Sequence, residues 1–318
     1  MRSHLFWKCV LPALALAGVL GSAGAAPYAY VPNEKSGTIS VIDIATRRVE
    51  TSIATGGAPR GIAASADGKR LYVSDKAAHG LVVIDLDARQ VVARIPLGES
   101  PEGVSLSPDG RWVVAAVELS NSVVFVDTVT REIAFSIKTS GKNPEHAVFS
   151  PDGRWLYVSA EEADSVDVIE VGTRREVVSI KVGQRPRGIG FLPDGSRAYV
   201  ACELASTVYA IDVAGQAVVA AIKAGQFANG IAVAPDGKRV YVSNGRDASV
   251  SVIDAAKNEA FATVAVGKRP WGLAATADGR AVFVANGRSN SVSVIDGASL
   301  KVSETIEVGE LPWGVTIR

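Results

Sequence analysis

The chain has 318 residues, of which 47% are hydrophobic and 21% are charged, with 33 basic and 33 acidic residues. This composition is typical of a folded globular protein, and the balanced charge does not favour a dedicated nucleic-acid binder. Three histidines, two cysteines and no Cys-x-x-Cys-His motif argue against multi-copper centres, zinc ribbons, iron–sulfur clusters and covalently attached haem.

The first 25 residues have the features of a bacterial signal peptide. Arg2 and Lys8 flank the start, residues 9–20 are apolar apart from Pro12, and Ala23-Gly24-Ala25 forms a small-x-small cleavage site. The apolar run is too short to span a bilayer as a helix. We therefore expect a signal peptide over residues 1–25 and a periplasmic or secreted mature protein over residues 26–318. Only Cys202 remains after cleavage, so an internal disulfide is excluded.

A unit of about 42 residues then repeats seven times. The tripeptide "VID" and its variants end at Asp43, Asp85, Asp127, Glu170, Asp212, Asp254 and Asp296, in steps of 42 or 43 residues. Asp-Gly pairs recur in phase with these tripeptides and indicate hairpin turns. We interpret both the recurrent Asp and the Asp-Gly pairs as turn residues rather than functional groups. The repeats fill the mature chain and leave no room for a second domain.

Each unit predicts four short strands. Residues 58–98 contain four runs rich in Val, Ile and Tyr, separated by Gly, Asp and Pro. Four strands in such a period are typical of a propeller blade. The N-terminal "YAYVPN" aligns with a second strand, whereas the C-terminal "LPWGVTIR" aligns with a first strand. The sequence therefore predicts an all-β, seven-bladed propeller with four antiparallel strands per blade, in which residues 311–317 complete the first blade.

The repeats resemble those of the YVTN-family β-propeller proteins. The matching motifs are "YVPN", "YVSN" and "FVAN", followed by "SVIDIAT", "SVIDAAK" and "SVIDGAS". This resemblance implies the fold but little about function, because propellers carry many unrelated activities. The tail "SNSVSVIDGASLKVSETIEVGELPWGV" also resembles members encoded with PQQ-dependent alcohol catabolism, which implies an accessory role in periplasmic quinoprotein metabolism.

A binding site is expected where the innermost strands begin, at one mouth of the central channel. A Pro-x-Gly corner opens these strands, and its central residue differs from blade to blade. Charged residues form one arc of the rim and aromatic residues the other. The predicted ligand-binding residues are Trp271, Trp313, Phe227, Asn229, Arg60, Arg187, Glu102 and Glu145. A flat aromatic surface on one side and a charged wall on the other suit an aromatic compound, a sugar or a short peptide. The alternative is that the charges pair across neighbouring blades and the indoles plug the channel.

His146 replaces the corner glycine that the other blades carry. Together with Glu145 it is a candidate metal ligand, although a hydrogen-bonded rim histidine is the simpler interpretation. Otherwise no cofactor is expected. Trp112 and Trp155 occupy one aligned position on the opposite face. They predict either a protein contact or rings that pack over their own hairpins.

The sequence therefore favours an exported, monomeric, non-catalytic binding or scaffold propeller over an enzyme. Its partner at the mouth would be a small molecule, a peptide or a periplasmic protein. One alternative is a lactonase- or lyase-like, metal-assisted enzyme, for which only Glu145 and His146 are suitable. The other is a single-stranded nucleic-acid binder that stacks bases on the rim tryptophans, against which the charge balance argues.

Overall fold

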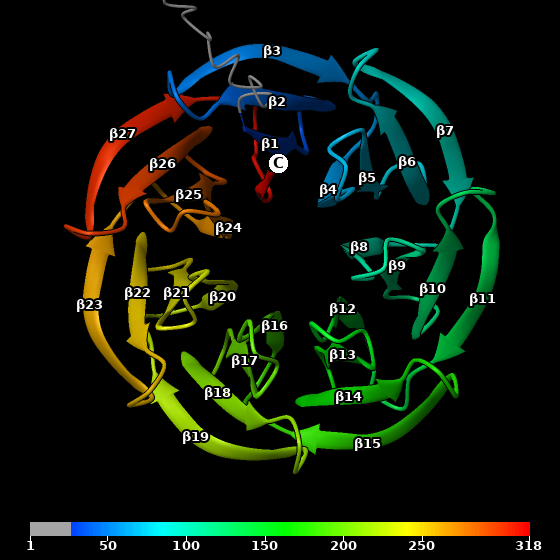
Figure 1. Cartoon of the computed structure of the whole chain (residues 1–318), viewed down its shortest axis with the longest axis vertical. Coiled ribbons are helices and arrows are strands. Elements are labelled where there is room, and N and C mark those ends of the chain that lie inside the picture. Colours follow the sequence, from blue (N-terminus) through cyan, green and yellow to red (C-terminus); the bar gives the residue numbers. More distant parts are fainter. Residues whose placement is uncertain (1–26) are drawn as a thin grey trace, which may run out of the picture.

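Seven four-stranded antiparallel sheets surround a central channel (Figure 1). The computed structural model describes residues 27–318, and the predicted signal peptide lies outside them. Each sheet is one blade, so the prediction of a seven-bladed propeller with four antiparallel strands per blade is confirmed. Among residues 27–318, the structure contains no helix that is long and apolar enough to cross a membrane.

The 28 strands fall into four layers from the channel outwards. The innermost strands are β28 (Thr316–Ile317), β4 (Pro59–Ala64), β8 (Pro101–Leu106), β12 (Pro144–Phe149), β16 (Pro186–Phe191), β20 (Ala228–Val233) and β24 (Pro270–Ala275). The second layer is β1 (Tyr28–Asn33), β5 (Arg70–Asp75), β9 (Trp112–Val117), β13 (Trp155–Ala160), β17 (Arg197–Cys202), β21 (Arg239–Asn244) and β25 (Ala281–Asn286). The third layer is β2 (Thr38–Asp43), β6 (Gly80–Asp85), β10 (Ser122–Asp127), β14 (Ser165–Glu170), β18 (Thr207–Asp212), β22 (Ser249–Asp254) and β26 (Ser291–Asp296). The outer layer is β3 (Arg48–Ala54), β7 (Gln90–Pro96), β11 (Ile133–Lys138), β15 (Arg175–Lys181), β19 (Ala217–Lys223), β23 (Glu259–Ala265) and β27 (Lys301–Glu307).

The recurrent aspartates hold the turns between strands. Asp43 Oδ1 accepts a hydrogen bond of 2.7 Å from the Thr46 backbone N–H, and the aspartates of five other blades make the same contact. In the remaining blade the Thr173 hydroxyl donates to the Glu170 carboxylate instead. In the Asp-Gly hairpins, Asp67 Oδ1 accepts one from the Lys69 N–H, while Gly68 adopts a left-handed φ of 68°. The carboxylates satisfy turn amides that the sheet leaves unpaired. Their interpretation as structural residues is therefore confirmed.

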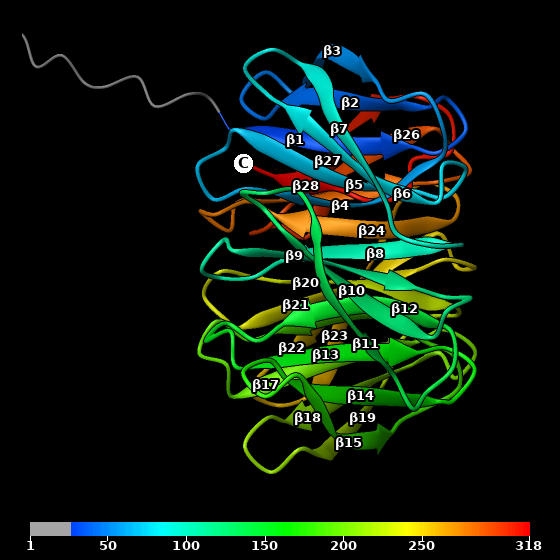
Figure 2. The ribbon, with the colours of Figure 1, turned by 90° about the vertical axis from the view of Figure 1, so that its right-hand side faces the viewer.

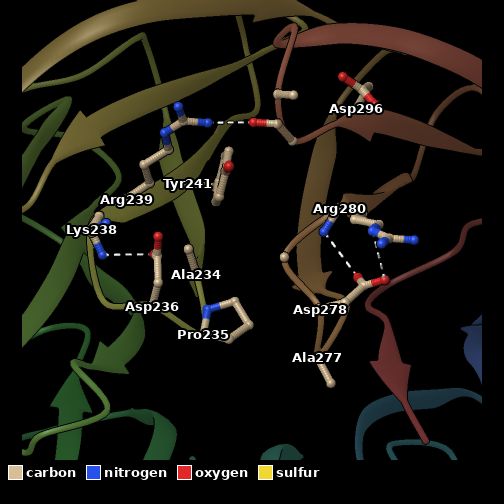
Figure 3. Close-up of a pocket in the computed structure, with 13 residues that line it drawn as sticks. Ala234, Pro235, Asp236, Lys238, Arg239, Tyr241, Ala277, Asp278, Arg280 and Asp296 are labelled. Carbon is tan, nitrogen blue, oxygen red and sulfur yellow. Dashed lines mark hydrogen bonds and ion pairs between the residues drawn. The ribbon is translucent and has the colours of Figure 1, made fainter.

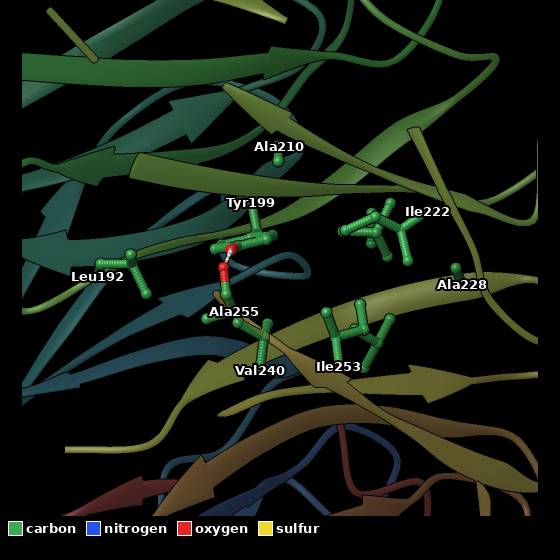
Figure 4. Close-up of a cluster of buried hydrophobic side chains, with 11 residues drawn as sticks. Leu192, Tyr199, Ala210, Ile222, Ala228, Val240, Ile253 and Ala255 are labelled. Atoms are coloured by element: carbon green, nitrogen blue, oxygen red, sulfur yellow. Dashed lines mark hydrogen bonds between the residues drawn. The ribbon is translucent and has the colours of Figure 1, made fainter. Parts of the chain in front are cut away.

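Burial follows the layers. The second and third strands are buried on both faces, because neighbouring blades pack against each of them, whereas the outer strands alternate between exposed and half-buried residues. A typical core between two blades contains Tyr199 and Val208 of one and Val240 and Ile253 of the next (Figure 4). The Tyr199 hydroxyl donates to the Ala255 carbonyl across that boundary, so blades are joined by polar as well as apolar contacts.

The C-terminus closes the ring. Strand β28 pairs antiparallel with β1 and gives the first sheet the order β28-β1-β2-β3. Upstream of β28, the Trp313 N–H donates to the Pro32 carbonyl at 2.9 Å, and Pro312 bridges to Asn33. The prediction that the C-terminal segment completes the first blade is therefore confirmed. Closure leaves β1 with a partner on each side.

Strands cross the thickness of the ring, so the connecting loops gather on its two faces (Figure 2). The innermost strands begin on one face, which we call the mouth face. The Asp-Gly hairpins lie on the other, which we call the hairpin face. Both ends of the described chain meet on the hairpin face, where the Arg318 N–H donates to the Tyr28 carbonyl.

Candidate functional site

A bulge at the start of six of the seven innermost strands, all except β28, directs one side chain into the channel mouth. In β4, Pro59 and Ile62 lie three positions apart, but their partners in β5, Asp75 and Val73, lie only two positions apart. Arg60 and Gly61 consequently face the single residue Ser74. Two residues opposite one define a β-bulge, which bends the strand and redirects its side chains. The residue between proline and glycine therefore points to the mouth rather than into a blade.

A serine opposite the bulge fixes this geometry. In β21, Ser243 Oγ accepts a hydrogen bond of 2.8 Å from the Gly230 N–H and donates one of 2.5 Å to the Trp271 carbonyl of the next blade. Ser74 makes the same pair of contacts in its blade. A Cβ at Gly230 would collide with the Trp271 carbonyl oxygen, so only glycine permits this approach between blades.

The mouth holds a cavity of about 140 Å³, which we call the mouth cavity. Its lining residues are Glu34, Arg60, Glu145, Arg187, Asn229, Arg269, Trp271 and Trp313. Six of these belong to the predicted ligand-binding set. The structure places the other two predicted residues, Glu102 and Phe227, outside this cavity. Glu34 and Arg269 were not in the set, although each stands beside a strand end at the mouth.

The two predicted tryptophans meet in this one cavity. Trp271 is half-buried and lies over Gly287, where a Cβ would come within 2.5 Å of the indole ring. Trp313 stacks on His146 across the channel, with ring centroids 5.5 Å apart and planes inclined by 20°. The indoles therefore form two apolar sides of the cavity.

The Trp313–His146 stack separates the mouth cavity from the inner channel. The inner space is about 130 Å³ and is lined by the corner glycines of the other blades, by His146 and by Trp313. His146 retains some surface, but it faces this narrow space. Burial lowers the pKa of the imidazole to about 4, with Arg187 adding to the effect. His146 is therefore neutral at neutral pH. Because the Trp313–His146 stack lies between the two spaces, the mouth cavity is a cup with a floor rather than an open channel.

Ion pairs join neighbouring blades around the charged half of the mouth. Arg60 Nη1 donates to both carboxylate oxygens of Glu102, at 2.6 and 2.7 Å, and its Nη2 contacts Glu34 at 2.8 Å. Arg187 Nη1 lies 2.5 Å from Glu145 Oε1. The pairing of these charges across blades, one of the two interpretations from sequence, is thus present. It also explains why Glu102 is buried beneath Arg60 instead of lining the cavity.

Carboxylates outnumber cations in this wall. The six carboxylates are Glu34, Glu102, Glu118, Glu145, Glu161 and Glu203, against Arg60, Lys76, Arg185, Arg187 and Arg269. Burial, reinforced by neighbouring carboxylates and opposed by Arg187, raises the pKa of Glu145 to about 8. Burial also raises the pKa of Glu118. Burial of these two carboxyl groups therefore opposes their ionisation, whereas the neighbouring cations favour it.

Glu118, Glu145 and Glu161 each place a carboxylate oxygen within 4.8 Å of the other two. Glu145 Oε2 is buried and has no hydrogen-bond partner. Oxygen ligands at this spacing fit a hard divalent cation such as Ca²⁺, whereas Arg187 already compensates part of their charge. His146 is not in this cluster, because it lies on the inner side of Trp313. The structure thus brings only Glu145 of the predicted metal pair to these carboxylates.

Three other residues singled out from sequence are packed into the blades. Trp112 and Trp155 are half-buried against core clusters, each with the preceding arginine over its ring at 4.4 and 4.5 Å. Protein contact at these positions stays a prediction. Cys202 is fully buried, and burial raises the pKa of its thiol to about 12, so it is not a rim nucleophile.

A cavity larger than the mouth cavity lies on the hairpin face, between the blades β20–β23 and β24–β27 (Figure 3). It measures about 720 Å³, but its acidic and basic groups serve local structure. The Asp236 and Asp278 carboxylates accept hydrogen bonds within their own hairpins, and Arg239 donates to the Gly297 carbonyl of the next blade. A similar groove recurs between the blades β4–β7 and β8–β11. These grooves therefore follow from the repeat, whereas the mouth cavity is lined by residues that differ from blade to blade.

Known proteins share both the fold and parts of the sequence. Residues 170–312 match the family model "Lactonase, 7-bladed beta-propeller", and residues 9–106 match the model "YNCE-like beta-propeller". No curated protein is significantly similar to the chain.

Two solved structures illustrate the similarity of fold. A chain of Kuenenia stuttgartiensis hydrazine synthase is 25% identical, with a TM-score of 0.78, over 85% of this chain and 92% of that chain. A functionally unknown protein from Desulfotomaculum acetoxidans DSM 771 is 18% identical, with a TM-score of 0.81, over 91% and 98% of the two chains. The protein is therefore a seven-bladed β-propeller with sequence similarity to the lactonase and YNCE-like propellers.

Proposed function

We propose that the protein is an exported, non-catalytic binding propeller that holds a small polar ligand in the mouth cavity. The observation that supports this most is the cup formed by Trp271, Trp313 and the charged wall. Its floor is the Trp313–His146 stack, so a ligand entering from the mouth face is retained there. Pockets with apolar walls and a few fixed polar groups are typical of ligand-binding sites.

The size and charge of the cavity restrict the ligand. About 140 Å³ is well below the volume that encloses a drug-sized molecule, so the ligand is a small compound or the end of a larger one. Arg60 and Arg187 are engaged with carboxylates, and a ligand of high net charge would have to break these pairs. A neutral or zwitterionic molecule with an apolar face, such as a sugar or an amino-acid residue of a peptide, fits best.

Calorimetric titration of the purified protein with sugars, amino acids and short peptides tests this proposal. Replacing Trp271 or Trp313 by Ala should weaken binding of the best compound by about 1–3 kcal/mol, as at an aromatic hot spot. Trp112→Ala, on the hairpin face, is the matched control and should bind as the wild type does. Normal binding by both mouth variants together with loss in Trp112→Ala would refute the site.

The export and the cellular role are part of the same proposal. The predicted signal peptide supports a periplasmic or secreted location, and the resemblance of the C-terminal tail supports an accessory role beside quinoprotein metabolism. Fractionation of bacteria that express the full chain should recover the mature protein, beginning at residue 26, outside the cytoplasm. Retention of residues 1–25 on a cytoplasmic product would contradict export.

Metal-assisted chemistry is a second candidate, favoured by the unpartnered Glu145 oxygen and by the match to the lactonase model. Glu118, Glu145 and Glu161 would hold the cation, which would supply Lewis-acid polarisation of a bound carbonyl. Addition of Ca²⁺ or Mg²⁺ should then raise the melting temperature of the wild type but not of Glu161→Gln. Equal responses of the two proteins would exclude the carboxylate cluster as the metal site.

A further inference from the structure

A second, shallower cavity of about 430 Å³ lies on the mouth face, outside the mouth cavity. Its lining residues are Phe227, Gly245, Arg246, Ala248, Lys268, Arg269 and Arg288, and we call it the cationic groove. Its residues come from loops before the innermost strand and after the second strand of the blades β20–β23 and β24–β27. These two blades are neighbours in the ring (Figure 1). Four of its seven lining residues are basic and none is acidic.

The charge of the groove is largely uncompensated. Among the four basic residues, only Arg269 pairs with a carboxylate, Glu203 Oε1 at 2.7 Å. Within residues 27–318, no carboxylate lies within ion-pair distance of Arg246, Lys268 or Arg288. The adjacent Asp247 accepts a hydrogen bond of 2.6 Å from the Gln226 N–H. Cations held together without counter-charges repel one another, and an anion would relieve that repulsion.

An aromatic ring provides a flat apolar surface in the groove. The guanidinium carbons of Arg246 and Arg269 lie 5.6 and 5.2 Å from the centroid of the Phe227 ring. Phe227 adopts a left-handed φ of 61°, a conformation unfavourable for a bulky residue. The turn itself does not require phenylalanine, because Ser100 and Asn143 occupy the same turn in other blades.

The groove exists only where the repeat changes. In the other five blades the residue after the second strand is charged: Glu34, Lys76, Glu118, Glu161 and Glu203. In the remaining two it is Gly245 or Gly287, each followed by arginine. A Cβ at Gly245 would lie 2.9 Å from Arg269 Nη1, so glycine lets this arginine extend across the groove. Gly245 thus stands where four of the other blades carry a glutamate, and it leaves space for the Arg269 side chain.

We propose that the cationic groove binds a small organic anion with at least two negative charges, phosphate or carboxylate, and a flat apolar part. The charged group would pair with Arg246, Lys268 and Arg288, since guanidinium groups match such oxygens in paired hydrogen bonds. The flat part would lie on Phe227. This site is distinct from the mouth cavity, although Arg269 borders both.

Titration calorimetry at low salt tests the proposal with four probes. Phenyl phosphate and phthalate carry two charges and a ring, inorganic phosphate lacks the ring, and phenol lacks the charge. At least one of the first two should bind, inorganic phosphate should bind more weakly, and phenol should not bind. The difference between phenyl phosphate and phthalate identifies the preferred anionic group.

Variants assign the binding to the groove. The double variant Arg246→Gln and Arg288→Gln should lower the affinity at least about tenfold. Phe227→Leu should lower the affinity for phenyl phosphate to the affinity that the wild type has for inorganic phosphate. Lys257→Gln removes one positive charge on the hairpin face and should leave the affinity unchanged. Undiminished binding by the double variant, or no binding of either ring-bearing anion, would overturn the proposal.

Two results would assign the anion to another site or the groove to another class of ligand. Loss of phenyl phosphate binding in Trp313→Ala, with normal binding in the double variant, would place the anion in the mouth cavity and refute the groove. Binding of a short oligothymidylate without binding of either small anion would assign the groove to single-stranded nucleic acid and overturn the small-anion proposal.

Discussion

Glu145 and His146 are adjacent in β12, yet their side chains face different spaces. Glu145 lies in the mouth wall among other carboxylates, where burial raises its pKa to about 8. His146 lies beneath Trp313, where burial lowers its pKa to about 4. Burial therefore favours the uncharged form of both residues. Strand alternation, together with the bulge, explains why two neighbours cannot serve one site.

The raised pKa of Glu145 predicts a pH-dependent stability. The folded protein holds a proton up to about pH 8, whereas the unfolded chain releases it near the ordinary value of 4.5. Stability should therefore fall as the pH rises between these values. Glu145→Gln cannot ionise and should lose this part of the dependence in denaturant unfolding between pH 5 and about 8.5. An identical pH profile of variant and wild type would show that Glu145 ionises normally.

The mouth residues were largely predictable from sequence, because the position between proline and glycine recurs in each repeat. Trp271, Trp313 and Arg187 all lie at this position and do line the cavity. Phe227 was predicted to lie one blade further along the aromatic arc, and it does not line this cavity. It precedes the strand and turns outward at a left-handed φ, so it lines the cationic groove. The burial of Glu102 depends on an ion pair between blades, which no local pattern reveals.

At the scale of the strand, the bulge links the fold to the site. Runs rich in Val, Ile and Tyr, bounded by Asp-Gly and other turn residues, predicted the four strands of each blade, and the structure contains them. The bulge was not predicted, because a local pattern does not specify how two strands pair. The serine opposite the bulge, such as Ser74 or Ser243, is recognisable in the sequence only as a small residue within a strand. Its role could not be predicted, because it bonds to a carbonyl of the next blade.

Removing that serine should weaken the contact between blades. Ser243→Ala leaves the Gly230 N–H and the Trp271 carbonyl without this partner in a fully buried setting. Each unsatisfied group costs about 1–3 kcal/mol, so the free energy of unfolding should fall by at least about 1 kcal/mol. Equilibrium denaturation measures the loss. Thr263→Ala on the exposed side of β23 is the control, and an equal effect of both changes would contradict the role of Ser243.

At the scale of the whole molecule, closure by the C-terminus supports both fold and mouth. The seven repeats and the offset of the two termini predicted this closure correctly. The same terminal segment carries Trp313, so the residues that complete the ring also form the floor of the mouth cavity. The asymmetric charge of the mouth face arises from differences among otherwise similar blades.

Deletion of residues 311–318 should open the ring. It removes β28 and the Pro312 bridge, and so leaves β1 as an unpaired edge that favours aggregation. We expect a lower melting temperature and concentration-dependent association by light scattering. A circular permutant that begins at residue 59 and joins residue 318 to residue 27 retains every strand and should remain monomeric. Unchanged stability of the truncated chain would refute closure as a determinant of the fold.

Hydrogen exchange read by mass spectrometry tests most directly whether the mouth cavity is the binding site. The mature protein is compared with and without the compound that binds most tightly in the calorimetric screen. Slower exchange is predicted in the mouth segments 144–147, 228–230, 270–272 and 312–314, with no change in the Asp-Gly hairpins. Protection confined to the hairpin face, or to the loops 245–248 and 287–290, would contradict binding in the mouth cavity.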